Sequence, residues 1–142
     1  MNQYDVIIIG AGPSGIFCAY ELIHKRPEMK VLIIEKGRRI ENRQCPKRKT
    51  KVCVGCKPCS ITTGFAGAGA FSDGKLSLSP DVGGNLPDIL GYDETVKLIH
   101  ESDEIYLKFG ADTNIYGVDK EKEIREIRRK AINANLKLIE CP

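Results

Sequence analysis

The chain has 142 residues, of which 42% are hydrophobic and 29% are charged, and its formal net charge is +3. This length suits one domain with a core of its own, and no apolar run approaches the ~20 residues of a membrane-spanning helix. The opening "MNQYDVIIIGAG" has no basic leader, which excludes a secretory signal, so we expect a cytoplasmic protein without a membrane partner.

The first predicted element is a strand in "YDVIIIG", and its β-branched run suits a strand covered on both faces of a parallel sheet. A helix follows in "PSGIFCAYELIHKR", where Cys18 is expected to be a small core residue. A second β-branched strand follows in "KVLIIE". This order predicts an α/β fold with a Rossmann-type parallel sheet, which the chain would leave incomplete at its C-terminal end.

The turn between the first strand and the helix, "GAGPSG", has the G-x-G-x-x-G spacing of a dinucleotide site. Gly10 permits the tight turn, Gly12 leaves room for a pyrophosphate, and Gly15 lets helix and strand pack closely. The helix N-terminus offers N–H groups to phosphates. Glu35 ends the second strand, where it can accept hydrogen bonds from ribose hydroxyls and disfavours a 2′-phosphate. These agreeing features favour a dinucleotide site over an ordinary glycine-rich turn, but the spacing does not separate NAD from FAD.

The segments "DVIIIGAGPSGIFCAYEL" and "VLIIEKG" resemble the glutathione-reductase-like family of two-dinucleotide-binding flavoproteins. In that family the motif binds the ADP half of FAD, so the resemblance favours FAD over NAD at this site. The FAD contacts that it implies are Gly10, Ala11, Gly12, Pro13, Ser14, Gly15, Glu35 and Lys36.

A basic, cysteine-rich stretch follows the second strand. Between Lys36 and Lys57 there are nine Lys or Arg residues and one acid, Glu41. Such a block is usually a solvated loop, and it can also attract an anionic partner such as phosphate. The stretch contains four cysteines, which are Cys45, Cys53, Cys56 and Cys59.

Four interpretations of these cysteines remain open. The C-x2-C-x2-C core of "CVGCKPC" begins like a ferredoxin run, which favours an iron–sulfur cluster. Thr63 stands where the fourth ligand is expected, so Cys45 would have to complete the set. The alternatives are a flavin-coupled dithiol such as Cys53 with Cys56, a structural zinc site, and thiols without a ligand.

The segment Gly64–Pro80, "GFAGAGAFSDGKLSLSP", is rich in small residues, which indicates backbone close to a flat or charged group. A flexible surface loop is the alternative. In related flavoproteins this segment returns to the pyrophosphate and the flavin ring. The likeness implies that the inner FAD wall is formed by Ala66, Gly67, Ala68 and Gly69. It also places Lys75 where a cation would stabilise negative charge on the reduced flavin.

The run from "CPKRKTKVCVGC" to "GAGAFSDGKL" is also similar to a group of bacterial and archaeal FAD-dependent dehydrogenases, and the similarity extends through "IYLKFGAD". Members of this group are longer than the present chain. The resemblance therefore implies that the chain corresponds to their N-terminal part.

Two helices are predicted in the last third of the chain. "YDETVKLIHESDEIYLKFG" has spaced apolar positions, with Asp93 as its N-cap and Gly110 at its end. "DKEKEIREIRRKAINANLKLIE" begins as a charged helix with a narrow apolar stripe and ends in a strand-like run. The mixed charges favour a solvated face, and no aromatic platform supports nucleic-acid binding.

The resemblances imply an FAD-dependent oxidoreductase in which electrons pass through the flavin. Residues 1–90 would form its FAD-binding region, and residues 91–142 a helical segment that starts a further strand. A small-molecule substrate or an electron donor or acceptor is the expected partner, and any NAD(P)H site would lie outside this sequence, so the chain alone would be inactive. The sequence indicates neither catalytic residues nor an oligomeric state. The alternatives are an NAD-dependent dehydrogenase and a non-enzymatic binding module stapled by a metal.

Overall fold

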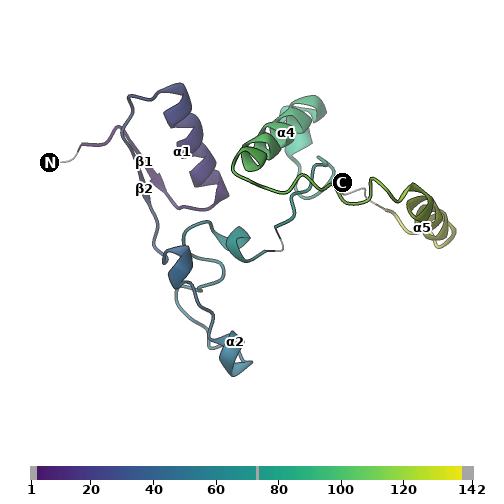
Figure 1. The fold of residues 1–142 in the computed structure, drawn as a ribbon, viewed down its shortest axis with the longest axis horizontal. Helices are drawn as coiled ribbons and strands as arrows, with labels where there is room; N and C mark the ends of the chain where they lie inside the picture. Colours follow the sequence, from purple (N-terminus) through teal and green to yellow (C-terminus); the bar gives the residue numbers. More distant parts are fainter. Residues whose placement is uncertain (1–2, 73, 139–142) are drawn as a thin grey trace. The chain divides into compact units, whose positions relative to one another are not determined.

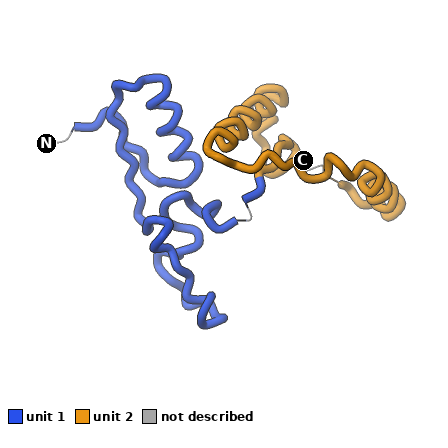
Figure 2. The backbone as a smooth tube through the Cα atoms, in the orientation of Figure 1, with its two compact units in different colours: residues 1–75 blue, residues 76–142 orange. Residues whose placement is uncertain are grey.

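A computed structural model describes residues 3–72 and 74–138. The chain divides into two compact units, residues 1–75 and residues 76–142 (Figure 2). The sequence predicts a division at residue 90, so the two divisions assign residues 76–90 differently.

The first unit is built on a strand–helix–strand motif. Strand β1 (Val6–Ile9), helix α1 (Pro13–Lys25) and strand β2 (Val31–Ile34) follow one another, and the two strands lie side by side (Figure 1). The strands are parallel, in a register that pairs Val6 with Val31 and Ile9 with Ile34. Helix α1 contacts both strands. This arrangement confirms the predicted α/β fold with a parallel, Rossmann-type sheet.

The sheet is covered on one face, which corrects the prediction of a strand covered on both. Successive side chains of a strand point to opposite faces, and Ile8 points toward Gly15 of α1. Ile7 and Ile9 point the other way and are 57% and 87% exposed. The described residues of this unit contain no element that packs on that second face. Cys18 of α1 is exposed as well and is not the core residue that the sequence predicts.

Irregular backbone connects β2 to the end of the first unit. It contains three short helical turns, which are η1 (Ile40–Asn42), α2 (Lys47–Thr50) and η2 (Ala68–Phe71). Lysine, arginine, proline and glycine dominate this stretch, so it has few apolar side chains to bury in regular elements. Its last part nevertheless returns to the sheet, because Gly64 pairs with Arg38 as an isolated parallel bridge beyond the end of β2.

The second unit contains helices α3 (Leu86–Leu90), α4 (Tyr92–Lys108) and α5 (Glu121–Asn133). Helix α3 packs against α4. The predicted cap of α4 is wrong, because Gly91, with a φ of +87°, is the N-cap and Asp93 lies in the first turn. The buried Thr95 hydroxyl donates a hydrogen bond to the Gly91 carbonyl at 2.8 Å. The negative charge of Asp93, in the first turn, interacts favourably with the positive end of the helix dipole.

Helix α5 carries ion pairs along its own surface. Arg125 and Glu121 lie 3.1 Å apart, and Lys130 and Glu126 lie 3.0 Å apart, in the i, i+4 spacing. The strand predicted after α5 is absent from residues 136–138, and its remaining positions lie outside the described residues. Within the described chain, no helix combines the length and the apolar character needed to cross a membrane.

Candidate functional site

The glycine turn between β1 and α1 is shaped by close backbone packing. Gly10 has a φ of +104°, a conformation that favours glycine, and its N–H donates to the Ile34 carbonyl at 2.7 Å. A Cβ atom on Gly15 would lie 2.1 Å from the Gly10 carbonyl oxygen and 3.3 Å from Cγ2 of Ile8. Only glycine therefore lets α1 approach the strand this closely.

The N-terminus of α1 is open to a ligand. A Cβ atom on Gly12 would meet nothing within 4 Å, so the backbone there faces free space. The N–H groups of Gly12, Ser14 and Gly15 make no hydrogen bond within the described residues, and Pro13 has none to give. No acidic side chain occupies the first turn of the helix. Free donors at the positive end of a helix form a suitable place for a phosphate.

Glu35 joins the end of β2 to the glycine turn. Its Oε2 accepts a hydrogen bond from the Ala11 N–H, and its Oε1 accepts one from the Gly37 N–H, each at 2.8 Å. These two bonds lower the pKa of the Glu35 carboxyl, and the bond from Ala11 has the larger effect. The Gly64 N–H makes a smaller contribution in the same direction. A carboxylate has about four acceptor positions, so Glu35 keeps at least one with which to bind a ribose hydroxyl. It is therefore a structural residue as well as a candidate ligand.

The glycine-rich segment returns to this turn. The Ala66 N–H donates to the Ala11 carbonyl at 2.8 Å. Gly67 has a φ of +62°, and a Cβ atom there would lie 3.3 Å from both Gly12 Cα and Pro13 Cδ. The segment 66–67 is thus a second wall beside the open face of Gly12. The next two predicted wall residues, Ala68 and Gly69, are exposed at the start of η2.

A close contact between two glycines brings the segment to this position. A Cβ atom on Gly37 would lie 2.5 Å from the Cα and the nitrogen of Gly64. The Phe65 N–H donates to the Arg38 carbonyl at 3.1 Å beside this contact. The sequence did not reveal the pair, because the two glycines lie 27 positions apart and no local pattern links them.

Arg43 is the functional candidate that sequence reasoning missed. It is 4% exposed, although it lies in the basic stretch that the sequence predicts to be solvated. Its guanidinium donates to four backbone carbonyls, those of Ser60, Ile61, Phe65 and Gly67, at 2.9, 2.5, 2.7 and 2.7 Å. Its Cζ also lies 4.8 Å from the centre of the Phe71 ring. Nothing in the residue pattern separates Arg43 from its exposed basic neighbours.

The four cysteines are not brought together as ligands. Cys45 is half-buried, and Cys53, Cys56 and Cys59 are exposed. Among the described residues, no group of three or more His, Cys, Asp or Glu side chains could hold a metal ion. Hydrogen bonds from the Thr62 and Ile61 backbone N–H groups lower the pKa of the Cys59 thiol. The predicted metal site therefore finds no support in this geometry.

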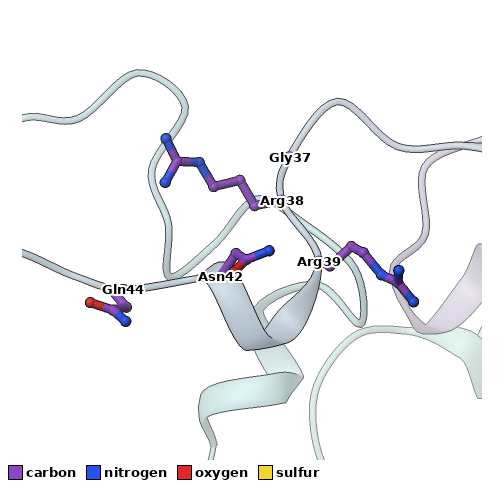
Figure 3. A pocket seen from close by; sticks show the side chains of 5 residues that line it. All are labelled: Gly37, Arg38, Arg39, Asn42 and Gln44. Carbon is purple, nitrogen blue, oxygen red and sulfur yellow. The ribbon is translucent and has the colours of Figure 1, made fainter.

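The remaining predicted contacts lie on the surface. Lys36 follows Glu35 and is exposed, and Lys75 is exposed at the end of the first unit. A shallow pocket opens just past the end of β2. Figure 3 shows that the Arg38 and Arg39 side chains at this pocket extend in different directions. The pocket is lined by Gly37, Arg38, Arg39, Asn42 and Gln44 (Figure 3).

The comparisons with known proteins concern the same strand–helix–strand motif. Residues 1–40 match the Thi4 family. Thiamine thiazole synthase from Coprinopsis cinerea is 52% identical over 33 residues, which are 23% of this chain and 10% of that protein. Those from Phaeosphaeria nodorum and Yarrowia lipolytica are 52% and 49% identical over 35 residues, which are 25% of this chain and 11% of each protein. No solved structure matches the chain.

The chain therefore spans 10–11% of the length of these curated relatives. The match covers the two strands, α1 and Glu35, which are the parts that form the glycine turn. Together with the geometry, it supports a coarse relation to enzymes with a dinucleotide-binding fold.

Proposed function

We propose that this chain is the FAD-binding part of a flavin-dependent oxidoreductase. The observation that carries the proposal is the open N-terminus of α1, where Gly12 faces free space and three N–H groups have no partner within the described residues. A bound FAD would supply the redox chemistry through its isoalloxazine ring. The residues of this chain would bind and orient it.

Each part of the site has a separate task in this proposal. The N–H groups of Gly12, Ser14 and Gly15 would donate to the pyrophosphate at the positive end of the helix. Glu35 would accept hydrogen bonds from the adenosine ribose with the acceptor positions that Ala11 and Gly37 leave free. The backbone of Ala66 and Gly67 would limit the site beside Gly12 and Pro13.

The choice of FAD over NAD rests on the sequence resemblance to two-dinucleotide-binding flavoproteins. NAD is the second candidate, because the same glycine turn and the same carboxylate serve both cofactors. The activity named for the relatives, thiamine thiazole synthesis, is not carried over, since the match covers about a quarter of this chain. A small-molecule substrate or an electron donor or acceptor remains the proposed partner.

The experiment is to purify the protein without added cofactor and to identify what it releases on denaturation. We expect a flavin absorbance spectrum and the mass of FAD. Release of NAD would replace the proposal with that of an NAD-dependent dehydrogenase. A colourless protein that takes up neither cofactor and instead binds RNA in a salt-sensitive way would favour the non-enzymatic binding module.

A further inference from the structure

Arg43 is a buried cation bound to backbone rather than to an acid. Within the described residues no carboxylate lies within ion-pair distance of its guanidinium, and all of its hydrogen bonds go to carbonyl oxygens. Its charge is a smaller cause of the lowered pKa of Glu35. Burying a charge is unfavourable unless hydrogen bonds compensate it. The planar guanidinium has five N–H donors in a fixed fork, so it can bind several carbonyls at once, which a lysine ammonium on a flexible chain does less well.

The acceptors of these hydrogen bonds all belong to one short stretch, residues 60–67. Nε binds the Ser60 carbonyl, one terminal nitrogen binds that of Ile61, and the other binds those of Phe65 and Gly67. This stretch contains no helix or strand whose own hydrogen bonds would hold it. Backbone N–H groups of Phe65, Ala66 and Gly67 bind carbonyls here. The Arg43 side chain adds donors for four carbonyls of the stretch, which regular secondary structure would otherwise supply.

Gly67 links this guanidinium to the glycine turn. Its carbonyl accepts a hydrogen bond from Arg43 at 2.7 Å. Its Cα lies so near the turn that a Cβ atom would be 3.3 Å from Gly12 Cα. The Ala66 N–H adds a bond of 2.8 Å to the Ala11 carbonyl. The Arg43 side chain thus holds Gly67, and Gly67 lies against the backbone of Gly12 at the open face of the turn.

We propose that Arg43 is a positioning residue of the dinucleotide site, which fixes the backbone of residues 66–67 beside Gly12 and so prepares the pyrophosphate subsite before the cofactor binds. This inference rests on the proposed function, because it assigns a task to Arg43 only if a dinucleotide enters the site. A loop that is ordered in advance loses less conformational entropy when its ligand binds. Without the guanidinium, that entropy would be lost on binding, and the phosphate end of the ligand would be held less tightly.

The test compares two ligands that share a nucleoside and differ in the pyrophosphate. ADP binding to the purified, cofactor-stripped protein is measured by equilibrium dialysis, and adenosine binding by competition with ADP. The variants are Arg43→Lys, which keeps the charge, and Arg43→Met, which removes it. Arg48→Met is the matched control, because Arg48 is an exposed cation 5.6 Å from the same Phe71 ring and donates to no carbonyl of residues 60–67.

We expect Arg43→Lys and Arg43→Met to weaken ADP binding by about tenfold or more, and adenosine binding by less than about threefold, because preorganisation acts at the phosphates. Arg48→Met should leave both affinities within about twofold of wild type. An unchanged ratio of ADP to adenosine affinity in the Arg43 variants would overturn the inference while leaving the proposed function intact. A wild-type protein that binds no ADP would overturn both.

A second variant keeps the test decisive where Arg43→Met does not fold. Gly67→Ala disturbs the same contact from the side of the loop, so it should lower the ADP affinity selectively, as Arg43→Lys does. If both residues act on one backbone position, the double variant should lose less than the product of the two single losses. If the loss of ADP affinity in the double variant equals the product of the two single losses, Arg43 does not act through Gly67.

Discussion

Glu35 shows how one side chain serves both the fold and the candidate site. Its two oxygens accept hydrogen bonds from Ala11 and Gly37, and these bonds fix the turn on one side and the chain beyond β2 on the other. The same carboxylate stands at the strand end where a dinucleotide ribose is expected. A substitution of Glu35 therefore affects stability as well as binding, and the two effects have to be measured separately.

The pH dependence of stability tests the structural part of this role. The pKa of Glu35 is lowered from its ordinary value of 4.5, chiefly by the Ala11 N–H and then by that of Gly37. Such a carboxyl adds stability above its unfolded pKa and loses it as the pH falls through the folded pKa. Glu35→Gln should therefore lower the unfolding temperature near neutral pH, and the difference from wild type should shrink below pH 4.5.

Thermal unfolding followed by circular dichroism across this pH range measures that difference. Glu41→Gln is the control, since Glu41 is an exposed carboxylate of the short turn η1. If the unfolding temperature of Glu35→Gln stays below that of wild type by the same amount at all pH values, the stabilising bonds do not depend on the ionised carboxylate, and the assignment is contradicted.

Gly12 allows binding to be separated from folding. A Cβ atom at this position would meet nothing within 4 Å, and the φ of −77° is accessible to any residue. Gly12→Val should therefore fold with an unfolding midpoint close to that of wild type. We expect it to retain no FAD, because the side chain would occupy the path of the pyrophosphate. Flavin absorbance per mole of purified protein measures the result. Normal flavin content would refute the proposal that the pyrophosphate of FAD binds at Gly12.

At the scale of elements, the β1–α1 contact is set by Gly15. The Gly10 carbonyl oxygen would lie 2.1 Å from a Cβ atom there, and this oxygen belongs to backbone that cannot easily move. Gly15→Ala should destabilise the protein by roughly 1–3 kcal/mol, as overpacking does in other cores. Ser14→Ala, at the exposed neighbouring position, should change stability by less than about 0.5 kcal/mol. Urea unfolding measures both, and equal stability of the two variants would contradict the close packing described here.

The cysteine stretch between β2 and Gly64 is the element whose role stays a prediction. If its four cysteines ligate a cluster or a zinc ion, Cys45→Ser should lose most of the metal that the anaerobically purified wild type contains. Iron, sulfide and zinc analyses of both proteins measure this. Cys18→Ser, at an exposed position of α1, is the control and should keep the metal. Full metal content in Cys45→Ser would exclude the four-cysteine site.

For the molecule as a whole, the small amount of buried apolar surface is the main feature. Among the described residues, the buried hydrophobic side chains are those of Ala11 and Ala131, and large apolar side chains such as Ile9 and Ile132 are exposed. Since burial of apolar surface is the dominant favourable term in folding, we expect the 142-residue chain to unfold with less than about 5 kcal/mol. Urea denaturation followed by circular dichroism gives this free energy. A cooperative transition with a clearly larger value would contradict the expectation.

The sequence by itself determined the strand–helix–strand motif, the glycine turn and the position of Glu35. These features depend on local causes, which are the β-branched runs, the helix-forming segment after Pro13 and the conformational freedom of Gly10. Residues close in sequence fix them, so their spacing can be read without a structure. The α4 helix was predicted for the same reason, although its cap was assigned to the wrong residue.

Only the tertiary structure decided what brings the glycine-rich segment back to the turn. The contact of Gly37 with Gly64 and the four carbonyl bonds of Arg43 join residues that are 17 to 27 positions apart. Such contacts follow from how the backbone packs in space, so they cannot be predicted from the amino-acid composition. The basic stretch looked uniform in sequence. Arg43 differs from its exposed basic neighbours in being buried, with its guanidinium donating to four backbone carbonyls.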